Sequence, residues 1–142
     1  MQPTRVLLRR GKFAPSGNET TIPVPASGAT VTLFDSTTNG NGIQPIRGLP
    51  FERLQVNIYS SHDSAANGVV FSSDFDGGNA AAPASTNWRQ QSTQSFTNAT
   101  APTTYDYLVR GGHAKVTYAN SANTLTAWEI EVWGVYDRNP GS

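Results

Sequence analysis

The chain contains no cysteine. That absence excludes disulfides and thiolate metal sites, so stability and ligand binding must depend on other chemistry. Charged residues are also scarce, at 14%, and ten Lys plus Arg balance ten Asp plus Glu. Because the formal net charge is zero, no long-range field draws the chain to nucleic acid or to an anionic membrane. We therefore expect its partners to be recognised by shape.

Long apolar runs are missing too. Near the N-terminus the continuous run is Val6 to Leu8, and Arg9 and Arg10 follow at once. This run is shorter than a secretory leader or a membrane-spanning helix requires. No segment repeats apolar residues at helical spacing over three turns. The 142 residues therefore predict one helix-poor, soluble domain made in the cytoplasm.

Period-two alternation, bounded by turn residues, is what the chain does have. In the last segment Trp128, Ile130 and Val132 alternate with polar or amphipathic neighbours, which is typical of a strand with one wet side. Strands are expected near residues 5–9, 21–24, 29–34, 52–59, 68–73, 88–95, 104–110, 113–118 and 124–136. Short strands at this spacing predict an all-β fold, an antiparallel sandwich or jelly-roll-like domain with an extended N-terminal arm.

The segment from Phe51 to Gly78 is the most informative of these. It alternates from Leu54 to Ile58, passes through polar residues, and alternates again from Val69. Asn67-Gly68 between the two runs suits positive φ. We interpret the segment as a half-buried β-hairpin that turns at this pair.

Several motifs in the same region carry a resemblance. These are Asn57 to Phe71, the Ser-Ser-Asp-Phe-Asp-Gly-Gly turn, Asn87-Trp88, Tyr107 to Arg110 and Val116 to Asn120. Together, over about residues 47 to 136, they resemble β-sandwich modules of structural proteins in tailed bacteriophages. Such modules occur in head-decoration, tail-tip and fibre accessory proteins. Relative to their pattern, this chain inserts residues 79–86.

Outside the resemblance, the N-terminal part carries a cationic cluster. Arg5, Arg9, Arg10 and Lys12 are four of the ten basic residues. They suit an arm that docks on a neighbouring subunit or an acidic virion surface, or equally an edge strand whose charges discourage strand pairing. Nucleic acid is a weaker third option. We divide the chain into an arm with a first edge strand (1–28), a sandwich (29–137) and a short tail (138–142).

Few residues are candidates for chemistry. Asp74-Phe75-Asp76-Gly77 resembles the start of a calcium loop but lacks its further ligands, so a plain turn explains it better. His62-Asp63-Ser64 contains triad residue types, yet adjacent residues diverge and cannot form the hydrogen-bonded line. His113 opens a strand and has no second His at metal spacing. No metal site, cofactor or catalytic residue is predicted.

Aromatic and acidic residues leave two alternatives open. Most rings fit core packing, whereas Trp133 and Tyr59 are the best exposed candidates for stacking on a sugar. Glu129 and Glu131 share one strand face at about 7 Å, which a glycosidase pair could use, although a wet face or a salt-bridge row explains them better.

The resemblance implies a virion protein of a tailed phage, assembled in the host cytoplasm, and the lack of a predicted catalytic set makes us expect a non-enzymatic one. The expected role is capsid decoration or cementing as a homo-oligomer, with a trimer suggested by how phage accessory proteins meet threefold positions. Partners would be the major capsid protein or tail proteins; no membrane is expected, and nucleic acid is disfavoured as a partner. The alternative is a tail-tip, baseplate or fibre module that binds host-surface carbohydrate. The expected interface residues are Arg5, Arg9, Arg10, Lys12, His113 and Trp133.

Overall fold

The structure, a computed structural model, describes residues 4–13, 22–36, 52–74, 88–109 and 113–136. These residues contain strands and no helix, which confirms the all-β prediction. The strands are β1 (Thr4–Lys12), β2 (Thr30–Asp35), β3 (Arg53–Ser60), β4 (Ser64–Asp74), β5 (Trp88–Gln94), β6 (Thr103–Leu108), β7 (Ala114–Asn120) and β8 (Trp128–Tyr136).

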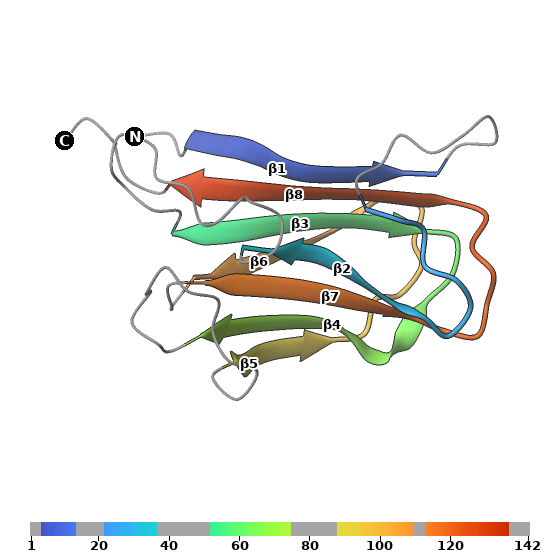
Figure 1. Cartoon of the computed structure of the whole chain (residues 1–142). Helices are drawn as coiled ribbons and strands as arrows, with labels where there is room; N and C mark the ends of the chain where they lie inside the picture. The colour runs from blue at the N-terminus through green and yellow to red at the C-terminus, as the bar shows by residue number, and fades with distance from the viewer. Residues whose placement is uncertain (1–3, 14–21, 37–51, 75–87, 110–112, 137–142) are drawn as a thin grey trace.

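The strands form two antiparallel four-stranded sheets that pack face to face (Figure 1). Sheet A has the order β1-β8-β3-β6, and sheet B has the order β2-β7-β4-β5. The pairs β1/β8, β2/β7, β3/β6 and β4/β5 are therefore nested inside one another along the chain. This nesting is the strand order of an eight-stranded jelly roll. The sandwich prediction is confirmed, and its jelly-roll form is defined.

Alternating side chains build the core between the sheets. In β3 and β7 every second residue is buried, as period-two geometry requires of strands with one wet side. The inward rings interlock: Tyr118 and Trp128 meet edge to face at 4.9 Å between centroids, and Phe71 stacks on Tyr107 at 4.6 Å. Each fully buried large apolar side chain contributes about 1.5–3 kcal/mol.

The predicted hairpin over residues 51–78 is wrong. β3 lies in sheet A and β4 in sheet B, so residues 61–63 cross from one sheet to the other. Asn67 does have positive φ (52°), but within β4, where the pairing with β7 shifts register between Ser64 and Val69. The pair Asn67-Gly68 therefore forms an irregularity in one strand rather than a turn between two.

Residues 22–24 are not a strand, contrary to expectation. Pro23 and Pro25 carry no amide hydrogen to donate to a ladder. Ile22 is nevertheless fully buried and belongs to the core. The alternating apolar pattern here therefore reports a buried side chain and not a β-strand.

The N-terminal residues 4–12 are an edge strand of sheet A, hydrogen-bonded along β8. The cationic residues of this strand therefore lie at the edge of sheet A, as the edge-strand interpretation expects, and docking on a neighbouring subunit stays a prediction. Residues 1–3 and 14–21 of the predicted arm lie outside the described residues. The tail at 138–142 does as well.

Candidate functional site

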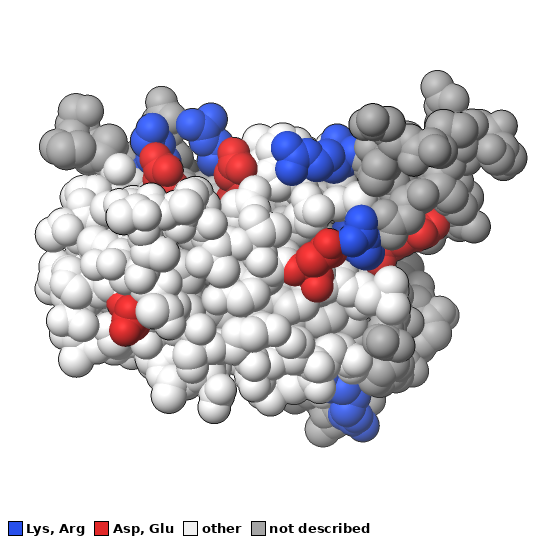
Figure 2. All heavy atoms as spheres, turned by 180° about the vertical axis from the view of Figure 1, so that it is seen from behind, with Lys and Arg blue, Asp and Glu red and all other residues white. Residues whose placement is uncertain are grey.

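The outer face of sheet A carries most of the residues that the sequence singled out. Cross-strand partners on this face form four rows, three across β1, β8, β3 and β6 and a fourth across β1, β8 and β3. The rows are Arg5–Val135–Arg53–Leu108, Leu7–Trp133–Gln55–Asp106, Arg10–Glu131–Asn57–Thr104 and Lys12–Glu129–Tyr59. Figure 2, which views the molecule from behind, shows Lys and Arg along the upper edge with Asp and Glu beneath them.

Four residues of the first two rows form a patch around Trp133, on the side of the sheet towards β1. The Arg5 guanidinium lies over the Trp133 ring at 4.1 Å from its centroid and also donates to Gln55 Oε1 at 3.4 Å. Leu7, the strand partner of Trp133, is 41% exposed. We call Arg5, Leu7, Gln55 and Trp133 the Trp133 patch. It combines an aromatic ring, a stacked guanidinium and an exposed aliphatic side chain.

A chain of hydrogen bonds crosses the sheet below this patch. Thr104 Oγ1 donates to Asn57 Oδ1 at 2.7 Å, and Asn57 Nδ2 donates to Glu131 Oε1 at 3.3 Å. From the other side Trp133 Nε1 donates to the same Glu131 oxygen at 3.2 Å. Two donors thus fix one carboxylate oxygen of Glu131 in place on the outer face, and the carboxylate is oriented in advance for any ligand.

Beside Glu131 the surface is hollowed into a cavity of about 180 Å³, which we call the Glu131 depression. Its walls carry two cations (Arg10 and Lys12), two carboxylates (Glu129 and Glu131), and Asn57, Tyr59 and Pro102. Lys12 Nζ lies 3.4 Å from Glu129 Oε1 in an exposed ion pair. The formal charge of the depression is therefore zero.

Arg9 faces the other way. Because β1 shifts register against β8 between Leu7 and Arg9, the side chain of Arg9 lies opposite the buried Val132. Its guanidinium reaches β2 in sheet B, where Nη1 donates to the carbonyl oxygens of Thr32 at 3.2 Å and Leu33 at 3.1 Å. Burial lowers the pKa of Arg9 from its ordinary value. Arg9 links the edges of the two sheets and does not lie on the outer face.

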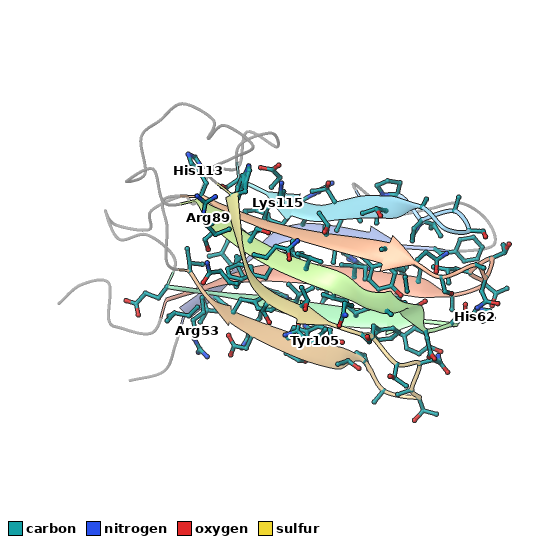
Figure 3. The ribbon with its side chains drawn as sticks, turned by 90° about the horizontal axis from the view of Figure 1, so that it is seen from below. Arg53, His62, Arg89, Tyr105, His113 and Lys115 are labelled. Atoms are coloured by element: carbon teal, nitrogen blue, oxygen red, sulfur yellow. The ribbon has the colours of Figure 1, made fainter. Side chains whose placement is uncertain are left out.

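His113 is also separate from the other predicted interface residues. Its Nδ1 lies 3.0 Å from Ser36 Oγ, at the start of β7 in sheet B. Figure 3 shows it with Lys115 and Arg89 at one end of the molecule, while His62 lies at the opposite end. The structure thus brings Arg5, Arg10, Lys12 and Trp133 together on one face, without Arg9 and His113.

The triad residue types at 62–64 make unrelated hydrogen bonds. Asp63 Oδ1 accepts a hydrogen bond from the backbone N–H of Asn98 at 2.7 Å, and Ser64 Oγ donates to the Ala65 carbonyl oxygen at 2.7 Å. His62 Nδ1 instead lies 3.0 Å from Ser61 Oγ. These contacts anchor the crossing between the sheets.

The remaining candidates are the possible metal ligands and the aromatic residues. Among the residues that the structure describes, no group of three His, Cys, Asp or Glu could hold a metal ion. Residues 75–77 of the calcium-like turn and the 79–86 insertion lie outside the described residues. Trp128, Tyr107 and Tyr118 are buried, whereas Tyr59 and Trp133 are partly exposed on sheet A. Burial raises the pKa of Tyr118 to about 12.

Sequence reasoning missed Asn57, Thr104 and Pro102. Asn57 and Thr104 occupy polar positions of alternating strands, but only the β3/β6 register makes them neighbours. No matching protein-family model, curated protein or solved structure was found for the chain. In the part that the structure describes, no helix has the length and apolar character needed to cross a bilayer.

Proposed function

We propose that this chain is a non-enzymatic structural protein of a tailed-phage virion that decorates or cements the assembled capsid as a homo-oligomer. The observation that carries the proposal is the eight-stranded jelly roll, an architecture used by viral capsid domains. The same architecture serves lectins and cupins, so fold alone is an analogy. The resemblance of residues 47–136 to phage virion modules favours the capsid role among these.

The Trp133 patch is the surface that we assign to attachment. Trp, Tyr and Arg are the residue types that most often dominate interface binding energy, because large, stiff side chains bury much area at little entropic cost. Here Arg5 is already stacked on Trp133, and exposed Leu7 is the cross-strand partner of Trp133. A neighbouring virion subunit would cover this pre-formed group with little rearrangement.

Locating the chain in intact particles by electron cryomicroscopy tests the role directly. We expect density on the head surface and a trimer by mass photometry of the purified chain. Density at the tail tip would instead favour the adhesion alternative and would overturn the capsid proposal.

Two matched variants test the attachment surface. Removing residues 1–12 would delete β1, so point changes are cleaner. Leu7→Asp puts a charge into the Trp133 patch. Leu108→Asp puts the same charge on β6, the opposite edge strand of sheet A, where the leucine is 50% exposed. We expect Leu7→Asp to reduce co-sedimentation with heads by at least about tenfold, because an unpaired interface charge is costly. Leu108→Asp should bind normally, and equal loss in both would contradict the assignment.

A further inference from the structure

The Glu131 depression has the composition of a small-ligand site that the capsid role does not use. Its volume of about 180 Å³ is below the roughly 300–1,000 Å³ of pockets for drug-sized ligands. It can therefore hold one six-membered ring rather than an extended chain.

Charge selects the kind of ring. An anionic ligand would meet the carboxylates of Glu129 and Glu131, and a cationic ligand would meet Arg10 and Lys12. A neutral ligand with several hydroxyl groups suits both pairs, because each hydroxyl both donates and accepts. The walls supply carboxylate acceptors, cationic donors and the Asn57 amide.

Geometry adds orientation to this composition. The oxygen Oε1 of Glu131 is fixed by Asn57 and Trp133. Tyr59 and Pro102 add ring surfaces to the wall of the same depression, and such surfaces can pack against the apolar side of a sugar. Trp133, by contrast, has the Arg5 guanidinium over its ring. Of the two aromatic candidates from the sequence, Tyr59 is thus the one that lines the cavity.

We propose that the Glu131 depression binds a single neutral monosaccharide unit, either free or at the end of a surface glycan. The inference does not depend on the capsid role, since the depression lies in the third and fourth rows and the Trp133 patch in the first two. A hexose has about twelve non-hydrogen atoms, and at roughly 0.3 kcal/mol of binding free energy per atom we expect a Kd on the order of 1–10 mM.

The indole N–H of Trp133 is a built-in reporter because it donates to Glu131. The ¹⁵N-labelled full chain is titrated with glucose, galactose, mannose and N-acetylglucosamine, and with glucuronate and glucosamine as charged controls. The three indole signals are assigned with Trp→Phe variants. A neutral sugar should move the Trp133 signal and leave the signals of core Trp128 and sheet B Trp88 in place.

Substitutions then test the walls. Glu131→Gln keeps an oxygen for Asn57 and Trp133 but removes the charge, and Tyr59→Ala removes the ring. Each should raise the Kd of the sugar at least about tenfold, because hydrogen bonds to charged groups and contacts with rings dominate the affinity of such sites. Thr93→Ala, an exposed change on β5 of sheet B, should have no effect.

Host cells distinguish the two sources of sugar. If the chain binds cells and the free monosaccharide displaces it from them, the ligand is the terminus of a surface glycan. If free sugar shifts the Trp133 signal but the chain does not bind cells, the ligand is a soluble sugar. No Trp133 shift with any neutral sugar or cell-wall polysaccharide, in a chain whose β-rich spectrum is intact, would overturn the proposal. Equal binding of charged and neutral sugars would do the same. Leu7→Asp should leave the titration unchanged, so failure here is separable from failure of the capsid role.

Discussion

Substitution of Gly68 tests the register shift between β4 and β7. Gly68 is buried and follows Asn67, whose φ is 52°. A Cβ atom at this position would lie 2.7 Å from the Ala119 carbonyl oxygen and 2.8 Å from the Ala65 carbonyl oxygen. Ordinary carbon–oxygen contacts in sheets are about 3.3–3.6 Å. Both neighbours are backbone atoms, so Gly68→Ala can be accommodated only by moving a strand.

The expected cost is about 1–3 kcal/mol, the range for overpacking a well-packed interior. For a domain of this size each kcal/mol lowers the Tm by roughly 3–4 °C. Urea unfolding followed by circular dichroism should show a lower midpoint with an unchanged m-value, because the surface exposed on unfolding is the same.

Gly28→Ala is the matched control. Gly28 has φ +70° but nothing within 4 Å of the added Cβ, so its cost of about 1 kcal/mol comes from backbone conformation alone. Gly28→Asn should cost less, since Asn tolerates this conformation. A Gly68→Ala protein within about 0.5 kcal/mol of the parent would refute the close approach of β4 to β7.

Two further predictions concern stability. Arg9→Ala removes the hydrogen bonds to the β2 carbonyls and should lower the free energy of unfolding by about 2 kcal/mol. Arg10→Ala, at an exposed position, should change the free energy of unfolding by less than about 0.5 kcal/mol. Urea midpoints that reverse this order would contradict the role of Arg9 in linking the edges of the two sheets. Burial raises the pKa of Tyr118 to about 12, so the folded state keeps this proton where the unfolded chain loses it above about pH 10. The stability present below pH 10 is therefore lost as pH rises from about 10 towards 12, and Tyr118→Phe should lose less between pH 9 and pH 11 in urea titrations; an equal loss in both proteins would refute burial of the hydroxyl as the cause.

Much of the fold could be read from local pattern. Eight of the nine expected strand segments overlap strands of the structure, and the inward set in β8, Trp128, Ile130 and Val132, is buried as alternation predicts. Side-chain alternation is a property of the extended backbone itself, so neighbouring residues suffice to reveal it. The segment with Pro23 and Pro25 was the exception, because alternation does not report whether amides can pair.

Pairing could not be read in this way. β3 and β4 each look like half of a hairpin, yet their partners are β8, β6, β7 and β5. Alternation says which side chains share a face but not which strand lies alongside. The Glu131 depression depends on that missing information, since its walls come from β1, β3, β8 and the residue before β6.

The adjacent residues Arg9 and Arg10 show where sequence stops and tertiary structure begins. The composition of β1 determined that it would be cationic and extended. The register shift at Leu8 decided that Arg9 reaches β2 while Arg10 lines the depression, because one extra residue in a strand exchanges its two faces. Such a shift is set by packing against β8, which lies more than a hundred residues further along the chain.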